Sequence, residues 1–396
     1  MATHIREQTC SLTPLPSTQS SPSPFISFNP YASPFSSPKP SISSPWDIQP
    51  HHSTSSSHRC LASIQKRFGK ITALAISDAG YLYVGSESLS IRVWNHPNLQ
   101  ESSKLRSSHG SIGAIVVSSE DGLIFSSHSD YKVRMWEGPF HIRKGTFPSL
   151  KDRLVEKCFS RPMAALTSNP IDKLKHTGTI TSLAYNSLAK LLYSASSDKT
   201  VKVWSVCDMK CVETIRAHND NVNAVAVGPD ELLFTGSDDS TVKIWRRSLG
   251  GSYHHVLLLK LHLQSCAVKA LAVSREGEDG YILYAGCSSG HVKYWVKGEL
   301  SGHMSYCGTL RGHNQAVLCL AAVDKMVISG SADTRIRVWK RSSDGLALHR
   351  CVAVLEGHVA PVKGVAAKME NEHGCVVYSG ALDGSTKKWL VMVAYG

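Results

Sequence analysis

The chain has 396 residues, a formal net charge of +12 and 42% hydrophobic residues. This length suffices for two or three ordinary domains, or for one large closed domain with a tail. Because the sequence has no apolar run of 18 or more residues and no apolar stretch typical of a secretory signal, we expect neither a membrane-spanning helix nor secretion. The eleven cysteines show no metal-ligand spacing, which favours reduced thiols in sheet positions and predicts no metal or cofactor.

Residues 1–58 form a tail rich in serine and proline. Such a segment buries too little apolar surface to offset the entropy lost on ordering, so we expect it to be disordered. Ten prolines by residue 50 argue against the amphipathic helix of a chloroplast transit peptide. Five serines that precede proline are candidate phosphorylation sites, although such pairs also arise from composition alone: Ser21, Ser23, Ser33, Ser37 and Ser44.

From residue 59 on, one phrase recurs seven times and ends in tryptophan, as in SASSDKTVKVW (194–204) and TGSDDSTVKIW (235–245). The closing residues are Trp94, Trp136, Trp204, Trp245, Trp295, Trp339 and Trp389. Repeats of about 40–45 residues that consist of short strands are typical of propeller blades. We therefore predict an all-β, seven-bladed propeller of four-stranded antiparallel blades over residues 59–396.

The two ends of the repeat array complement each other. The segment CLASIQKRFGKITALAIS (60–77) aligns with CVETIRAHNDNVNAVAVG (211–228), which makes residues 60–65 an outer strand with no preceding blade. The last repeat reaches KKWLVMV (387–393) and lacks an outer strand. We predict that the N-terminal strand closes blade seven.

An insertion is expected between blades two and three, over about residues 148–175, because 68 residues separate Trp136 from Trp204. Its segment SLKDRLVEKCFS (149–160) opens with a Ser-x-x-Asp capping pattern and predicts a short amphipathic helix. Residues 139–175 hold eight Lys or Arg against three Asp or Glu. The insertion is either a tolerated surface loop or a docking element for an acidic partner, with Arg153 and Lys157 as candidate contacts.

A basic residue also stands two positions before each tryptophan: Arg92, Arg134, Lys202, Lys243, Lys293, Arg337 and Lys387. A position that is basic once per blade favours packing within the ring. Binding of phosphate is the less favoured interpretation, because no aromatic residues alternate with these cations.

Five repeats share a histidine, a hydroxyl residue, an aspartate and a tryptophan at matching positions. The sets are His109, Ser126, Asp130, Trp136; His176, Ser194, Asp198, Trp204; His218, Thr235, Asp239, Trp245; His313, Ser329, Asp333, Trp339; and His358, Ser379, Asp383, Trp389. Serine, histidine and aspartate also form hydrolytic triads, but an enzyme needs one such site in one pocket. Because the set returns in five blades, we predict a structural network and no catalytic residues.

In this predicted network the aspartate accepts from the histidine, the histidine bonds the hydroxyl, and the hydroxyl accepts from the indole N–H. Two blades depart from it. Blade one has Arg67, Val84 and Ser88 at the histidine, hydroxyl and aspartate positions, and blade five keeps His262 but has Ala285 and Ser289.

These repeats resemble those of WD40-repeat proteins over residues 60–396. The family's Gly-His pair stands here as Gly312-His313 and Gly357-His358, although no repeat tryptophan is followed by aspartate. The phrases LLYSASSDKTVKVW, AHNDNVNAVAV and LRGHNQAVLCL are similar to plant WD-repeat proteins of the JINGUBANG type. The resemblance implies a non-catalytic plant regulator of cytoplasm and nucleus that acts in growth and development through protein partners such as transcription factors.

We expect partners to bind the rim that carries the histidine loops and the neighbouring turns. Candidate residues there are Arg67, Ser197, Asn219, Asp220, Asn221, Asp238, Asn314 and Gln315, although each is also consistent with an ordinary solvated loop. Two alternatives stay open: a substrate receptor of a cullin-type ubiquitin ligase, whose docking pattern is not found, and an RNA-binding propeller that uses the basic insertion. We expect a monomer with no small-molecule substrate and no membrane association.

Overall fold

The computed structural model describes residues 57–65, 69–96, 98–107, 110–138, 140–149, 174–248, 254–277, 280–297, 303–342, 348–371 and 374–392. Residues 1–53 and 54–396 form separate units, and all described residues belong to the second. Residues 1–56 of the predicted tail and residues 150–160 of the predicted helix lie outside the described residues.

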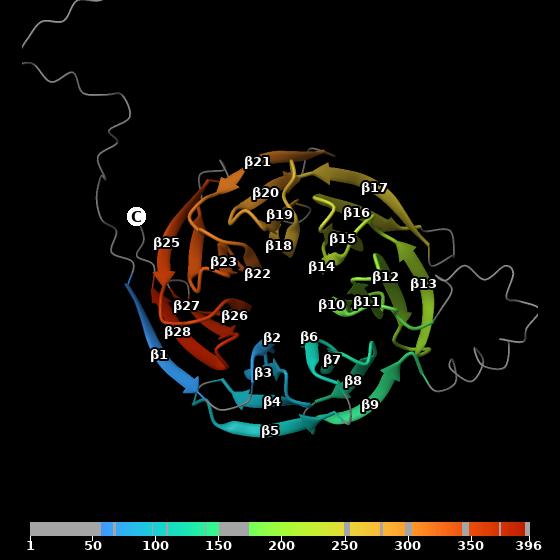
Figure 1. Ribbon diagram of the computed structural model, residues 1–396, viewed down its shortest axis with the longest axis horizontal. Coiled ribbons are helices and arrows are strands. Elements are labelled where there is room, and N and C mark those ends of the chain that lie inside the picture. The colour runs from blue at the N-terminus through green and yellow to red at the C-terminus, as the bar shows by residue number, and fades with distance from the viewer. Residues whose placement is uncertain are drawn as a thin grey trace, which may run out of the picture. The chain divides into compact units, whose positions relative to one another are not determined.

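The described residues form 28 strands in seven antiparallel sheets of four strands, which follow one another around a ring (Figure 1). Blade one has β2 (Ile71–Ile76), β3 (Tyr81–Ser86), β4 (Ser90–Asn95) and β5 (Glu101–Arg106). Blade two has β6 (Ile112–Ser118), β7 (Leu123–His128), β8 (Val133–Glu137) and β9 (Ile142–Phe147). Blade three has β10 (Ile180–Asn186), β11 (Leu191–Ser196), β12 (Thr200–Ser205) and β13 (Lys210–Arg216).

Blade four has β14 (Val222–Val227), β15 (Leu232–Ser237), β16 (Thr241–Arg247) and β17 (His255–His262). Blade five has β18 (Val268–Glu276), β19 (Gly280–Cys287), β20 (Val292–Lys297) and β21 (Met304–Leu310). Blade six has β22 (Val317–Val323), β23 (Met326–Ser331), β24 (Ile336–Arg341) and β25 (His349–Leu355). Blade seven has β26 (Val362–Asn371), β27 (Gly374–Ala381), β28 (Ser385–Met392) and β1 (Ser57–Gln65). The predicted all-β, seven-bladed fold is confirmed.

Blade seven is completed by the N-terminal strand. β1 pairs antiparallel with β28, from Ser57 opposite Met392 to Gln65 opposite Ser385. The strand begins two residues before the expected start of the propeller, because its pairing continues to the end of β28. The ring thus closes with one sheet that joins both ends of the described chain (Figure 1).

The hydrophobic core lies between neighbouring blades. Between blades two and three, for example, Phe125 and Phe147 pack with Leu192 and Trp204, and all four side chains are buried. The inner and middle strands are apolar on both faces, as expected for strands covered on both sides, and β11 is buried along its whole length. Burial of this apolar area, at about 25 cal/mol per Å², drives each blade onto the next.

Polar bonds near the ring's axis also join blades. In blades one, three and four the second residue of the inner strand donates to the carbonyl oxygen of the first residue of the next inner strand. Thr72 donates to Ile112 at 2.6 Å, Thr181 to Val222 at 2.5 Å and Asn223 to Val268 at 2.8 Å. These bonds satisfy backbone groups that face the central opening rather than the sheet.

The outer strands carry a recurring irregularity. In blades one to six the pairing of the third and fourth strands shifts register at the tryptophan, as between Val203 and Trp204 or between Ile244 and Trp245. In blade seven the shift falls between Cys60 and Ala62. Such bulges twist an edge strand and disfavour pairing with a strand from another chain.

Candidate functional site

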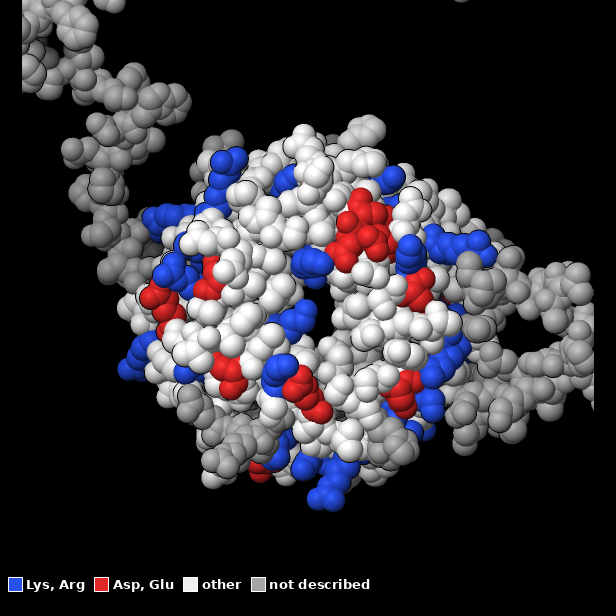
Figure 2. All heavy atoms as spheres, in the orientation of Figure 1, with Lys and Arg blue, Asp and Glu red and all other residues white. Residues whose placement is uncertain are grey.

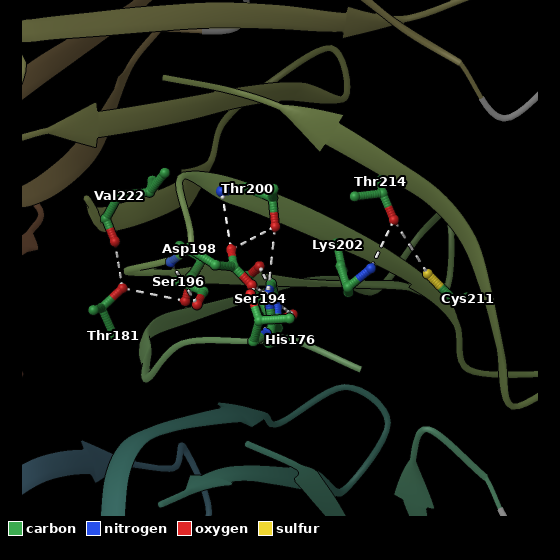
Figure 3. Close-up of polar contacts among 12 residues, drawn as sticks. His176, Thr181, Ser194, Ser196, Asp198, Thr200, Lys202, Cys211, Thr214 and Val222 are labelled. Carbon is green, nitrogen blue, oxygen red and sulfur yellow. Dashed lines mark hydrogen bonds and ion pairs between the residues drawn. The ribbon is translucent and has the colours of Figure 1, made fainter. Parts of the chain in front are cut away.

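The polar network of blade three links a loop, a turn and two strands (Figure 3). His176 Nδ1 lies 2.8 Å from Asp198 Oδ2, and its Nε2 lies 2.8 Å from Ser194 Oγ. Trp204 donates its indole N–H to the same hydroxyl at 2.9 Å. The histidine comes from the loop before β10, the serine from β11, the aspartate from the turn after β11 and the tryptophan from β12. Four separate segments are therefore held in one register.

Blades four, six and seven repeat this geometry. The histidine to aspartate distance is 3.0 Å for His218 and Asp239, 2.9 Å for His313 and Asp333, and 3.2 Å for His358 and Asp383. The histidine to hydroxyl distance is 2.8 Å to Thr235, 2.9 Å to Ser329 and 2.8 Å to Ser379. Trp245, Trp339 and Trp389 donate to these hydroxyls at 3.0, 2.9 and 2.8 Å. The structure thus brings together four of the five predicted sets.

The network histidines are buried, and the charge state follows from that burial. Burial lowers the pKa of His218, His313 and His358, although the neighbouring aspartates oppose the shift. For Asp198 burial raises the pKa of the carboxyl, but the hydrogen bonds and the nearby imidazole outweigh it and hold the pKa well below its usual range. In blades four, six and seven the favoured state is a neutral imidazole that donates to an ionised carboxylate.

Blade two keeps the predicted bond from Trp136 to Ser126, and it gives Ser126 and Asp130 further partners that the prediction did not include. The Ser126 hydroxyl meets His128 Nε2 at 2.9 Å, while Trp136 donates to that hydroxyl at 3.0 Å. Asp130 accepts two hydrogen bonds from the Arg134 guanidinium, at 2.8 and 3.1 Å. His128 stands two residues after Ser126 on β7, so strand alternation places its ring beside the hydroxyl. His109, the predicted partner, lies outside the described residues.

Blade five shows that His262 is not the equivalent of the network histidines. His176 and His218 stand four residues before the first residue of the next inner strand, and the residue four before Val268 is Gln264. His262 is instead the exposed last residue of β17. Near Ser289 the Cys266 thiol takes the place of an imidazole and donates to the Ser289 hydroxyl at 2.8 Å.

Blade one replaces the network with hydroxyls alone. Ser86 and Ser88 lie 2.7 Å apart through their hydroxyl oxygens, and the Ser88 hydroxyl donates to the Ser90 carbonyl oxygen at 3.3 Å. Val84, at the predicted hydroxyl position, is buried and apolar. Blade one thus bonds hydroxyls within its turn, whereas blade five bonds its turn to the preceding loop through Cys266.

Sequence reasoning missed a further hydroxyl in three of these networks. Thr200 donates to Asp198 Oδ1 at 2.6 Å, Thr241 to Asp239 at 2.6 Å and Ser385 to Asp383 at 2.6 Å. Figure 3 shows Thr200 and His176 on either side of the Asp198 carboxylate. The signal is visible in the sequence as a threonine or serine two residues after the turn aspartate, in SSDKT, SDDST and ALDGS.

The basic residues two before each tryptophan bond within the ring. Lys202 donates to the Thr214 hydroxyl on the outer strand of its own blade at 2.8 Å (Figure 3). Lys243 and Lys293 donate to backbone oxygens of Ala217 and Leu263, which follow the outer strand of the preceding blade, at 2.5 and 2.9 Å. Lys387 reaches the Ser63 hydroxyl of β1 at 2.9 Å. Their positive charge is therefore used inside the fold.

The predicted rim residues differ in how available they are. Asn219, Asp220, Asn314 and Gln315 are exposed, and Ser197 is half-buried. Asp238 and Asn221 are tied to each other at 3.2 Å, and Asp238 also accepts from Asn223 at 2.7 Å and from Lys269 at 2.5 Å. This cluster links blades four and five beside the central opening.

Arg67 lies outside the described residues. So do seven other predicted partner or modification residues: Arg153, Lys157, Ser21, Ser23, Ser33, Ser37 and Ser44. The proposed roles of these residues stay predictions.

The arrangement presents no accessible nucleophile in the four complete networks. The hydroxyls of Ser194, Thr235, Ser329 and Ser379 are fully buried, and each already bonds an imidazole and an indole. Within the described segments, no three His, Cys, Asp or Glu side chains are placed to hold a metal ion. The described part of the chain also contains no helix with the length and hydropathy needed to cross a membrane.

Charges of both signs are interspersed over the face shown in Figure 2, around an opening at the centre of the ring. Inner-strand residues of all seven blades line a central cavity of about 200 Å³, including Lys269 and Lys363. This face carries no single continuous basic surface of the kind that follows a nucleic-acid backbone.

Comparison with known proteins shows what these blades are similar to. Four segments, residues 168–205, 209–246, 304–340 and 349–389, match the family described as "WD domain, G-beta repeat". The chain is 24% identical to Autophagy-related protein 16 of Arabidopsis thaliana over 277 residues, 65% of this chain and 52% of that protein. It is 27% identical to Zinc finger CCCH domain-containing protein 62 of the same plant over 150 residues, 37% of this chain and 33% of that protein.

A third relative is Nuclear distribution protein PAC1 of Coccidioides posadasii, 26% identical over 211 residues, 49% of this chain and 43% of that protein. The chain thus spans about half of the first relative and less of the other two. The four matched segments cover the inner, second and third strands of blades three, four, six and seven, the described blades in which the histidine network is complete. The chain is therefore a seven-bladed β-propeller in which four segments match WD40 repeats.

Proposed function

We propose that this protein is a non-catalytic scaffold that binds other proteins on the rim formed by the histidine loops and the adjacent turns. WD40 propellers are typically protein-interaction scaffolds. The proposal rests on a contrast, at this rim of blades three, four, six and seven, between network side chains and loop residues. The side chains that could do acid–base chemistry are buried and bonded to one another, whereas the loop residues beside them are exposed.

The rim offers polar groups that differ between blades at one of two matching loop positions. Blades four and six both present an asparagine after the network histidine, Asn219 and Asn314, followed by Asp220 in blade four and Gln315 in blade six. The loop backbone itself is fixed, because Asn219 N and Asn314 N donate to the turn aspartates at 3.1 and 3.0 Å. A rigid backbone with variable polar side chains supports specific recognition at low entropic cost.

We further propose that the protein is a plant regulator of cytoplasm and nucleus, acting in growth and development through partners such as transcription factors. The resemblance to plant WD-repeat proteins of the JINGUBANG type supports this role. Two of the relatives described above come from Arabidopsis thaliana, which is consistent with a plant protein.

The test is quantitative affinity purification from plant cells with a rim variant and a matched control. The rim variant is Asn219→Arg with Asn314→Arg, and the control is Ala79→Arg with Ser187→Arg, in the turns that join the first and second strands of blades one and three. We expect the rim variant to lose partners that the control keeps, at equal melting temperatures. If both variants retain the full set of partners, the rim is not the binding surface.

A further inference from the structure

The outer strand of blade four is apolar on its exposed surface, unlike the other outer strands. In β17, HVLLLKLH, four consecutive side chains are exposed: Val256 at 55%, Leu257 at 43%, Leu258 at 49% and Leu259 at 38%. The described parts of the other six outer strands each carry at most one exposed large apolar side chain, such as Leu61, Ile142 or Tyr306. Contiguous exposed apolar residues in a folded protein mark an interaction site.

We propose that β17 is a docking surface for an amphipathic helix of another protein, in which acidic residues flank the apolar stripe. This inference rests on the proposed scaffold function and adds a second surface, away from the histidine rim.

The charged side chains of β16 and β17 themselves are all basic, and the two neighbouring acids, Glu213 and Glu231, are bonded to His255 and Arg247. Strands β16 and β17 hold Lys243, Arg246, Arg247 and Lys260 and no acidic residue. Lys243 bonds the Ala217 carbonyl oxygen and Arg247 pairs with Glu231, whereas Arg246 and Lys260 are exposed. Arg246 stands opposite Val256 in the sheet, and Lys260 follows four residues later, about 13 Å along the strand. The two exposed cations thus bracket the apolar side chains.

A helix fits this surface better than an added strand does. Pairing of β16 with β17 shifts register between Ile244 and Trp245, so that Leu258 is an extra residue in a bulge. A bulge in mid-strand breaks the regular row of backbone groups that strand addition requires. Recognition is therefore through side chains. On a helix, two acids seven residues apart lie on one face about 10 Å from each other, within reach of Arg246 and Lys260.

A second copy of the chain is excluded as the occupant by charge and size. Two β17 strands in contact would bring the cations Arg246 and Lys260 of one copy against those of the other. The eight residues of β17 are also far fewer than the roughly 20–30 residues per side of a standard interface.

Segments of the same chain outside the described residues do not fit either. Residues 1–56 contain two acids, Glu7 and Asp47, forty residues apart, and residues 150–173 hold five Lys or Arg against three Asp or Glu. An acidic, apolar helix must therefore come from another protein.

The proposal is tested with the full-length protein and two synthetic 18-residue helical peptides, by fluorescence anisotropy. Both peptides carry one leucine stripe; one has two glutamates seven residues apart on its flank, and the other has lysines there. We expect the glutamate peptide to bind, and its Kd to rise at least tenfold with Leu258→Glu and to change less than twofold with Leu188→Glu. Leu188 is the matched control because it is 84% exposed in a turn of blade three.

Charge reversal gives the sharper result. Lys260→Glu should weaken binding of the glutamate peptide and strengthen binding of the lysine peptide. The proposal is overturned if the glutamate peptide does not bind, if both peptides bind equally, or if Leu258→Glu has no effect. Val256→Thr serves as a second variant if Leu258→Glu lowers the melting temperature.

Two outcomes separate this inference from the scaffold function. If the rim variant loses its partners in cells but the glutamate peptide does not bind, the scaffold function is supported and the β17 docking surface is refuted. Sedimentation velocity is run in parallel, and a dimer that Leu258→Glu converts to a monomer would identify a second copy as the occupant and refute the proposal.

Discussion

The Tyr193 hydroxyl lies 3.2 Å from His255 Nε2, which ties the second strand of blade three to the outer strand of blade four. His255 in turn bonds Glu213 at 2.6 Å through Nδ1. The same tie recurs between Tyr83 and His141 and between Tyr284 and His349, whereas Tyr378 bonds His96, which follows the third strand of blade one. At the matching position blades two and four have Phe125 and Phe234 and blade six has Ile328, so the tie is made by alternate blades.

Removal of the Tyr193 hydroxyl tests this tie. Tyr193→Phe should destabilise the protein by about 1–3 kcal/mol, because it leaves a buried imidazole nitrogen without its partner. The measurement is urea unfolding. Tyr306→Phe is the control: Tyr306 is exposed and bonds the Thr309 hydroxyl, so water replaces what it loses. Equal losses in the two variants would show that the interblade bond contributes nothing.

The histidine network should contribute strongly to stability. His218→Ala removes bonds to Asp239 and Thr235 and opens a buried space, so we expect a loss of about 2–4 kcal/mol in urea unfolding. His262→Ala is the matched control, since this histidine is exposed at the end of β17. It should change stability by less than about 0.5 kcal/mol. A larger effect at His262 than at His218 would reverse the assignment made for blade five.

The protein should become less stable as the pH falls below about 6.5, the ordinary pKa of an unfolded histidine. Burial lowers the pKa of His128 to about 4, and it also lowers the pKa of His218, His313 and His358. The unfolded chain therefore takes up protons that the folded chain does not. The stability that these groups contribute is complete above pH 6.5. It is lost as the pH falls from 6.5 toward the lower pKa values of the folded state.

For His128 alone the loss between pH 6.5 and 5 is about 2 kcal/mol. Melting temperatures measured from pH 8 to 5 should fall, and they should fall less steeply in His128→Gln. A melting temperature that stays constant or rises toward pH 5 would contradict the neutral state assigned to these imidazoles.

Ring closure by β1 predicts different effects for two truncations. Deletion of residues 60–66 removes most of the outer strand of blade seven and should lower the melting temperature by more than 10 °C, or prevent folding, since the edge of β28 is then unpaired. Deletion of residues 1–53 removes a separate unit and should leave the melting temperature within about 2 °C. Similar melting temperatures for the two truncations would refute the closure.

The fold was predictable because the sequence repeat is strong and because the interactions that define a blade join residues close together in the sequence. Each tryptophan marks a third strand, and the missing outer strand of blade seven has one candidate in the chain, near Cys60. The network in blades three, four, six and seven was predictable for the same reason, since spacing within a repeat fixes which residues meet.

The differences arose where neighbouring residues on the same strand or loop make bonds that the repeat pattern does not contain. In blade two His128, on β7, bonds Ser126, and Arg134 bonds Asp130. In blade five the loop register depends on where β17 ends, and a histidine two residues away was mistaken for the network member. The ties such as Tyr193 to His255 depend on distances across blades, which a reading of single repeats does not contain.

The closure of the ring has a consequence for synthesis of the chain at the ribosome. β1 is made before the other strands of the propeller, but its partner β28 emerges only after more than 300 further residues, as the bond between Ser63 and Lys387 spans 324 positions. At typical translation rates β1 waits roughly 15–65 s without a partner. Its polar side chains, among them His58, Arg59 and Ser63, make it a poor template for aggregation during that delay.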